Sequence, residues 1–125
     1  MSSIFLSHWR MRMSKVLIIE DNVDLSNLFQ MVLDIHGISS EICRDGRDAA
    51  GAIDSIRPQV VVLDMHLPHV SGASIFETIK KDHPEIAVLI VTADRDLYSE
   101  YRNKTKAFLK PMDMDALHHE VRSAL

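Results

Sequence analysis

Five polar side chains that could carry chemistry stand where short apolar runs of this 125-residue chain end. Glu20 and Asp21 follow the first run, and Asp64 follows the second. Thr92 and Lys110 follow two later runs; the four runs span residues 16–19, 60–63, 86–91 and 107–109. Nearly continuous apolar runs between helical patterns are typical of strands in a parallel sheet that is buried on both faces. Because ligand sites in such sheets lie at the carboxyl ends of the strands, we expect these side chains to meet at one edge.

The three carboxylates in this set favour a hard divalent cation. Glu20, Asp21 and Asp64 would repel one another around one point, and Mg²⁺, which prefers oxygen ligands and keeps several waters, would remove most of that cost. A phosphoryl group could then be held between the metal, the Lys110 ammonium and the Thr92 hydroxyl. With the group held in this way, a carboxylate can act as nucleophile and form an acyl phosphate. Catalysis would consist of positioning and charge neutralisation.

Helical patterns separate the predicted strands. Apolar residues recur at helical spacing between Leu25 and Leu33, where we expect a helix with Asp24 as its N-cap and Gly37 as its stop. Residues 38–43 form a weaker and more polar pattern, which is typical of a strand at the edge of a sheet.

The second half of the chain continues the alternation. A turn at Asp45-Gly46 precedes a helix that ends before Pro58, and a third helix ends before Pro84. Residues 94–106 carry few apolar side chains, so any helix there should be short. A last helix begins near Asp113 and should bury Met114 or Leu117, together with Val121 and Leu125. Five strands that alternate with helices predict one open α/β sheet with right-handed crossovers.

Composition limits the classes of function. The chain is long enough for one domain with a proper core, and its 46% hydrophobic and 26% charged residues are ordinary for a globular protein. A net charge of −4 argues against a nucleic-acid partner, which would require clustered Lys and Arg. Cys43 is the single cysteine, which fits a reducing cytoplasm. No apolar stretch approaches the roughly 18 residues of a membrane span, so we expect no membrane association.

Residues 1–13 differ in character from the remainder of the chain. They contain a short apolar patch followed by two arginines, a pattern that does not fit a secretory signal. We expect a disordered N-terminal extension, with the domain spanning residues 14–125. The alternative is an arm that docks on a partner or on another copy of the chain through Ile4, Phe5, Leu6 and Trp9.

Four stretches resemble the receiver domain of bacterial two-component response regulators, the CheY-like family. They span residues 15–22, 62–72, 90–93 and 108–111, and the similarity extends over residues 14–125. The resemblance implies a single flavodoxin-like (βα)5 domain of three layers, with an open parallel sheet in strand order 2-1-3-4-5. It also implies that Lys110-Pro111 is a cis peptide.

The same resemblance assigns a role to each candidate residue. Asp64 would accept the phosphoryl group from a sensor histidine kinase or a histidine phosphotransfer protein. Mg²⁺ would be bound by Glu20, Asp21, Asp64 and the backbone carbonyl of His66. Thr92 would be the switch hydroxyl, and Lys110 would form an ion pair with the phosphate.

Two features depart from the family pattern. Thr92 and Lys110 are 110 − 92 = 18 positions apart, about four fewer than usual, which predicts the loss of about one helical turn of 3.6 residues. The switch aromatic of the family stands three residues before the lysine, where this chain has Ala107. Phe108 lies one position late, and Tyr98 or Tyr101 could substitute only after a rearrangement; which of the three serves is left open.

We therefore expect a stand-alone receiver, because the chain ends with the fifth helix. It would be a cytoplasmic monomer that is not an enzyme and that signals through protein–protein contacts. One alternative is a degenerate receiver that acts as a scaffold without phosphorylation. Another is a Mg²⁺-dependent aspartyl-phosphate phosphatase of the haloacid dehalogenase kind. That class has an acid two residues after its nucleophile, where this chain has His66, and it also needs a cap domain.

Overall fold

The computed structural model describes residues 15–125, and its five strands form one parallel sheet. Their order is β2-β1-β3-β4-β5, which confirms the flavodoxin-like topology predicted from the sequence. The strands are β1 (Val16–Ile19), β2 (Ser40–Cys43), β3 (Val60–Asp64), β4 (Ala87–Thr92) and β5 (Lys106–Leu109). The N-terminal extension, in either of its two interpretations, lies outside the described residues.

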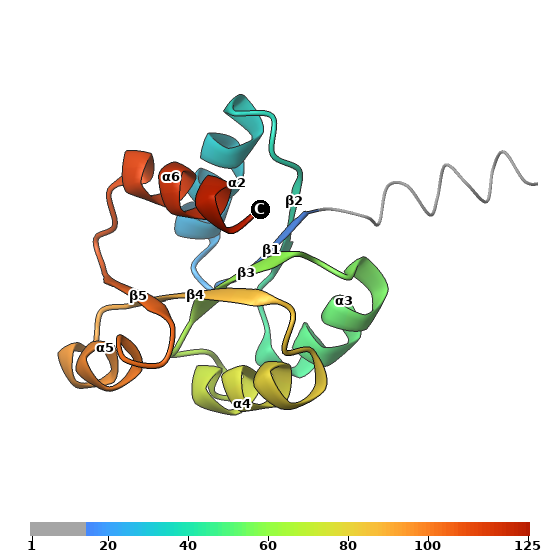
Figure 1. Ribbon diagram of the computed structural model, residues 1–125, viewed down its shortest axis with the longest axis vertical. Helices are drawn as coiled ribbons and strands as arrows, with labels where there is room; N and C mark the ends of the chain where they lie inside the picture. Colours follow the sequence, from blue (N-terminus) through green and yellow to red (C-terminus); the bar gives the residue numbers. More distant parts are fainter. Residues whose placement is uncertain (1–14) are drawn as a thin grey trace, which may run out of the picture.

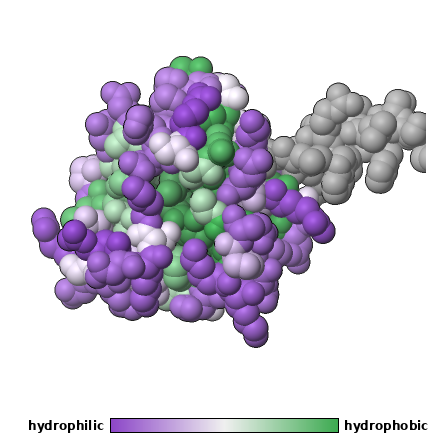
Figure 2. Space-filling view, in the orientation of Figure 1, coloured by the Kyte–Doolittle hydropathy of each residue, from purple (hydrophilic) through white to green (hydrophobic). Residues whose placement is uncertain are grey.

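Helices cover both faces of this sheet, so that the domain has three layers (Figure 1). One face carries α2 (Val23–Ile35) and α6 (Met114–Ala124); the other carries α3 (Ala49–Ile56), α4 (Gly72–Asp82) and α5 (Arg95–Tyr101). A short 3-10 turn, η1 (Gly46–Asp48), leads into α3. In the same orientation, apolar residues gather over the middle of the visible face and hydrophilic residues surround them (Figure 2). Among residues 15–125, no helix is long and apolar enough to cross a membrane.

Alternate residues of each central strand enter two separate hydrophobic cores. In β1, Leu17 and Ile19 pack in the core beneath α3, α4 and α5, whereas Val16 and Ile18 pack in the core beneath α2 and α6. All four side chains are completely buried. Successive side chains of a strand point to opposite faces, so a strand covered on both sides must be apolar at every position. This requirement explains the uninterrupted apolar runs of the sequence.

The register of the sheet aligns the residues that follow the strands. Ile19 pairs with Leu63, which places Glu20 opposite Asp64. Asp64 pairs with Val91, the residue before Thr92, and Thr92 pairs with Leu109, the residue before Lys110. Residues from four segments therefore reach the same edge through backbone pairing alone.

Three local predictions were wrong. Asn22, not Asp24, caps α2, because the chain is still extended at Asn22 and its Oδ1 accepts the Leu25 N–H at 2.8 Å. The second strand begins at Ser40, because the Ile38 N–H is used by the Leu33 carbonyl at the end of α2. Leu125 is 39% exposed, since it follows the last turn of α6.

Two predictions are confirmed: the first helix stops at Gly37, and the helix within residues 94–106 is short. Gly37 has a φ of 75°, the left-handed conformation that ends helices and favours glycine. Helix α5 has seven residues, and Asp94 caps it by accepting the N–H groups of Asp96 and Leu97.

We expect Asn22→Ala to lower the free energy of unfolding by about 1 kcal/mol, the usual cost of losing an N-cap. Asp24→Ala should lower it by less, about 0.3–1 kcal/mol, because Asp24 interacts only with the helix dipole. Urea denaturation followed by circular dichroism, without divalent cations, measures both. A larger loss for Asp24→Ala would reverse the assignment of the cap.

Candidate functional site

The carboxyl edge of the sheet brings Lys110 into contact with two of the predicted carboxylates. Its Nζ lies 2.8 Å from Glu20 Oε1 and 3.4 Å from Asp64 Oδ1. Glu20 is 2% exposed and Asp64 5% exposed, and the Lys110 side chain is largely covered as well. Ion pairs of this kind are hardly screened by solvent, and each partner depends on the others to offset its desolvation. The Lys110-Pro111 peptide is cis, as the resemblance to the receiver family implied.

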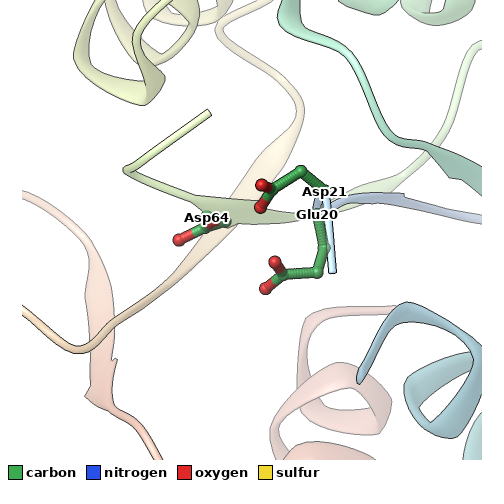
Figure 3. A group of neighbouring side chains, drawn as sticks. All are labelled: Glu20, Asp21 and Asp64. Carbon is green, nitrogen blue, oxygen red and sulfur yellow. The ribbon is translucent and has the colours of Figure 1, made fainter. Parts of the chain in front are cut away.

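The three carboxylates among the predicted metal ligands form one cluster. Oxygen atoms of Glu20, Asp21 and Asp64 all lie within 4.8 Å of one another, and the three side chains extend from the ends of β1 and β3 into a common space (Figure 3). Asp21 is exposed while the other two are buried, so the cluster is open to solvent on one side. Opposite oxygens around an octahedral Mg²⁺ are about 4.2 Å apart, and the ion prefers carboxylate oxygen. Both the donor set and its spacing therefore fit Mg²⁺.

Backbone groups hold the buried carboxylates in place. The Asn22 N–H donates to Glu20 Oε2 at 3.2 Å, and the Glu20 N–H donates to the Cys43 carbonyl at 3.1 Å. The His66 N–H donates to Asp64 Oδ1 at 3.4 Å. These donors come from residues that directly follow or flank the strands, so the strand ends fix the orientation of the acids as well as their position.

Thr92 reaches the same edge as a completely buried residue at the end of β4. Its Oγ accepts the Asp94 N–H at 3.0 Å, and its carbonyl accepts the Lys110 N–H at 2.9 Å. Because Oγ is the acceptor in the first of these bonds, the hydroxyl proton remains available for another acceptor. The backbone bond ties Lys110 to Thr92, the other residue predicted to contact the phosphoryl group.

Burial and charge shift the pKa values of the clustered groups. Burial raises the pKa of Glu20 and of Asp64, although Lys110 opposes the rise in both. For Lys110, burial alone would lower the pKa, but the Glu20 and Asp64 carboxylates outweigh it and raise the pKa above its usual value. The lysine is therefore firmly protonated, whereas the two carboxylates gain from any further positive charge.

The rim of the site contains a side-chain contact between two flanking residues. His66 Nε2 lies 3.4 Å from Asp94 Oδ2, which joins the loop after β3 to the N-terminus of α5. The sequence placed each residue two positions after a site residue, but it gave no signal that they touch. The predicted role of His66 concerns its backbone carbonyl and remains a prediction.

Gly72, at the start of α4, packs directly on the backbone next to Asp64. A Cβ at Gly72 would lie 2.5 Å from the Asp64 carbonyl oxygen and 2.5 Å from Met65 Cα. The absence of a side chain thus permits the close approach of α4 to the strand end. The sequence indicated only a requirement of the backbone at this position.

The aromatic residues near β5 differ in their packing. Ala107 lies in the core beneath α3, α4 and α5, where Tyr101 of α5 is 4% exposed and contacts Phe76 edge-on at 5.3 Å between ring centroids. Phe108 is half-buried and points to the opposite face of the sheet, since it pairs with Val91. Of Phe108, Tyr98 and Tyr101, the three candidates for the switch aromatic, Tyr101 is therefore the one that belongs to the same core as Ala107.

This fold and this edge define a class: α/β domains with an acidic cluster and a buried lysine at the carboxyl ends of a five-stranded parallel sheet. The chain belongs to the response regulator receiver domain family, whose sequence description it matches over residues 16–122. Membership places it among the receiver domains of response regulators.

Similar proteins agree with this assignment. The chain is 29% identical over 111 residues to the luminescence regulatory protein LuxO of Vibrio campbellii, which covers 86% of this chain and 24% of LuxO. It is also 29% identical over 115 residues to the transcriptional regulatory protein TrcR of Mycobacterium tuberculosis, covering 89% of this chain and 45% of TrcR. It thus spans less than half of the length of either relative.

A solved structure shows the same architecture. The response regulator receiver domain protein of Clostridium thermocellum superposes with a TM-score of 0.80 at 25% identity, covering 89% of this chain and 93% of that one.

In buffer without divalent cations, Asp64→Asn should raise the thermal midpoint. Burial raises the pKa of Asp64 in the folded chain, so the fold favours the protonated carboxyl group. The stabilising contribution of Asp64 is therefore complete below the pKa of the unfolded chain and is lost as the pH rises through the pKa of the folded chain. The gain from Asp64→Asn should therefore be larger at about pH 8 than at about pH 4.

Differential scanning calorimetry with a chelator tests this expectation, with Asp82→Asn on the exposed end of α4 as control. A lower midpoint for Asp64→Asn at about pH 8 would contradict it.

Proposed function

We propose that Asp64 accepts a phosphoryl group in a Mg²⁺-dependent reaction and that the phosphorylated domain signals through protein–protein contacts. The observation that supports this most directly is the position of Lys110 Nζ, which bridges Glu20 and Asp64 inside the carboxylate cluster. A protonated lysine and a cation site on either side of one buried carboxylate are the parts that phosphoryl transfer requires.

The metal would be held by Glu20, Asp21, Asp64 and the backbone carbonyl of His66. When bound, Mg²⁺ supplies positive charge that screens the carboxylates and the incoming phosphoryl oxygens. One Asp64 oxygen then attacks phosphorus, the bond from phosphorus to the donor atom breaks, and the donor keeps the electron pair. The product is a mixed anhydride on Asp64, and the donor is a phosphohistidine of a sensor kinase or of a phosphotransfer protein.

Lys110 and Thr92 would divide the remaining work. The Lys110 ammonium is already within ion-pair distance of Asp64 and can pair with a phosphoryl oxygen there. The Thr92 hydroxyl has a proton to donate to another phosphoryl oxygen, because its Oγ already accepts a backbone N–H. On this assignment, lysine assists the transfer, and threonine mainly registers its product.

The chain would act as an acceptor rather than as an enzyme, since Asp64 is consumed by the transfer. We further propose a cytoplasmic monomer. The buried free thiol of Cys43 suits a reducing compartment, and the short α5 offers little surface for a fixed dimer.

Incubation with acetyl phosphate and Mg²⁺ should add one phosphoryl group to the protein, and Asp64→Asn should abolish the addition. Intact-protein mass spectrometry measures this, with Asp82→Asn as a control that should label normally. Equal labelling of the Asp64→Asn variant would refute the acceptor. An unlabelled wild type would favour the scaffold, and sustained hydrolysis of phosphate monoesters would favour the phosphatase.

Lys110→Ala should slow phosphorylation by about ten- to hundredfold, because a charge-assisted contact contributes about 1.5–3 kcal/mol. Thr92→Ala should slow it by only about two- to tenfold, in line with a neutral hydrogen bond of about 0.5–1.5 kcal/mol. Stopped-flow or quenched labelling gives the rates, and Lys106→Ala, which alters an exposed lysine, is the control. Equal losses at Lys110 and Thr92 would remove the division of roles.

His66→Ala and Asp94→Asn should each shorten the lifetime of the phosphorylated form by up to about fivefold, since an exposed pair contributes at most about 1 kcal/mol. The two residues touch at the rim, so breaking their contact opens a path for water. Asn can still cap α5, which leaves the helix intact.

The double variant should match the single variants rather than multiply their effects. Loss of label over time measures this, with Asp96→Asn as control. Unchanged lifetimes in both single variants would rule the contact out as a barrier to water.

A further inference from the structure

The turn that follows β2 packs against the loop that carries part of the proposed metal site. Gly46 is buried, and a Cβ there would lie 2.5 Å from the Val70 carbonyl oxygen and 2.9 Å from Val70 Cβ. Its φ is not in the left-handed region, so glycine is required here for close approach rather than for backbone conformation. The residues at Gly46 and Val70 thus interlock two loops that are far apart in the sequence.

Asp45 adds a polar contact to the same junction. Its Oδ2 lies 3.2 Å from His69 Nδ1 and 2.8 Å from Arg47 Nη2, while Oδ1 accepts the Arg47 N–H at 2.8 Å. The bonds to Arg47 lower the pKa of Asp45 to about 2, so that the carboxylate stays charged at all ordinary pH values. His69 has a φ of 71°, a conformation that costs free energy for a residue other than glycine. Asp45 therefore contacts the loop at its strained residue.

The loop of residues 65–71 connects Asp64 to α4. Its far end is fixed where the Gly72 N–H donates to the Met65 carbonyl at 3.2 Å and where α4 packs on the backbone of Asp64. Its second residue is His66, whose carbonyl is the fourth proposed metal ligand. Between these points, the contacts of Val70 and His69 with the turn restrain its outer side.

We propose that Asp45 and Gly46 are positioning residues that hold the loop of residues 65–71 in the shape required for binding Mg²⁺. The inference rests on the proposed metal-dependent function but concerns residues that touch neither the metal nor the phosphoryl group. Outer partners of this kind orient the groups that do bind, and their loss usually costs ten- to hundredfold in metal affinity.

Gly46→Ala tests whether the contact of Gly46 with Val70 holds the loop in place, with Gly51→Ala as a matched control. Gly51 lies in α3 with nothing within 4 Å of an added Cβ, so the control makes the same chemical change without a collision. Titration calorimetry with MgCl₂ should show Mg²⁺ binding about tenfold weaker for Gly46→Ala and unchanged for Gly51→Ala. Ile53→Val removes one methyl group from the core beneath α3. It should lower the thermal midpoint without changing Mg²⁺ affinity.

Hydrogen exchange measured without metal tests whether Gly46 restrains the loop of residues 65–71 independently of the proposed Mg²⁺ binding. Without metal, the backbone amides of the loop should exchange faster in Gly46→Ala than in the wild type, whereas those of β1 and β3 should not change. A wild type that binds no Mg²⁺ would refute the proposed function. The exchange rates would still show whether Gly46 restrains the loop. Wild-type exchange and wild-type affinity in Gly46→Ala would overturn the inference. If Gly46→Ala does not fold, Asp45→Asn, which removes the charge facing His69, is judged by the same two measurements.

Discussion

The ion cluster of Lys110, Glu20 and Asp64 is the interaction on which the site depends. Two buried carboxylates cannot remain charged side by side without positive charge, and a single lysine supplies only part of it. Burial raises the pKa values of both carboxyl groups although Lys110 opposes the rise, while the two carboxylates raise the pKa of the lysine. Negative charge therefore exceeds positive charge at this edge of the sheet. A divalent cation, or a change of charge at Asp64, would alter that balance.

The register of the sheet brings these charged groups to one edge. Glu20 stands opposite Asp64, and Lys110 follows the residue paired with Thr92. The strands can align so rigidly because both of their faces are buried in separate cores. Slipping one strand by a single residue would turn its side chains to the wrong face, and it would also separate the charged groups. The packing that stabilises the fold is therefore the same packing that assembles the site.

Much of this arrangement could be predicted from residue order, because apolar runs and the polar residues after them are local signals. Predictions failed where two local solutions competed. Asn22 and Asp24 can both cap a helix, and the extended backbone at Asn22, which the sequence does not mark, makes Asn22 the cap. The contacts between Asp45 and His69, and between His66 and Asp94, join loops that approach each other only after folding, so no spacing in the sequence marks them. Gly46 looked like an ordinary turn glycine, and its tight contact with Val70 becomes visible only in three dimensions.

Tyr101 has a consequence for how a signal could leave the site. Its ring is anchored edge-on against Phe76 and belongs to a helix, whereas Ala107 on the adjacent strand has no ring to rotate. Tyr101 is the last residue of α5 and is 4% exposed, so a displacement of its ring would disturb the packing of this helix against Phe76. A signal that changed the environment of this ring would therefore reach the surface through α5 rather than through β5.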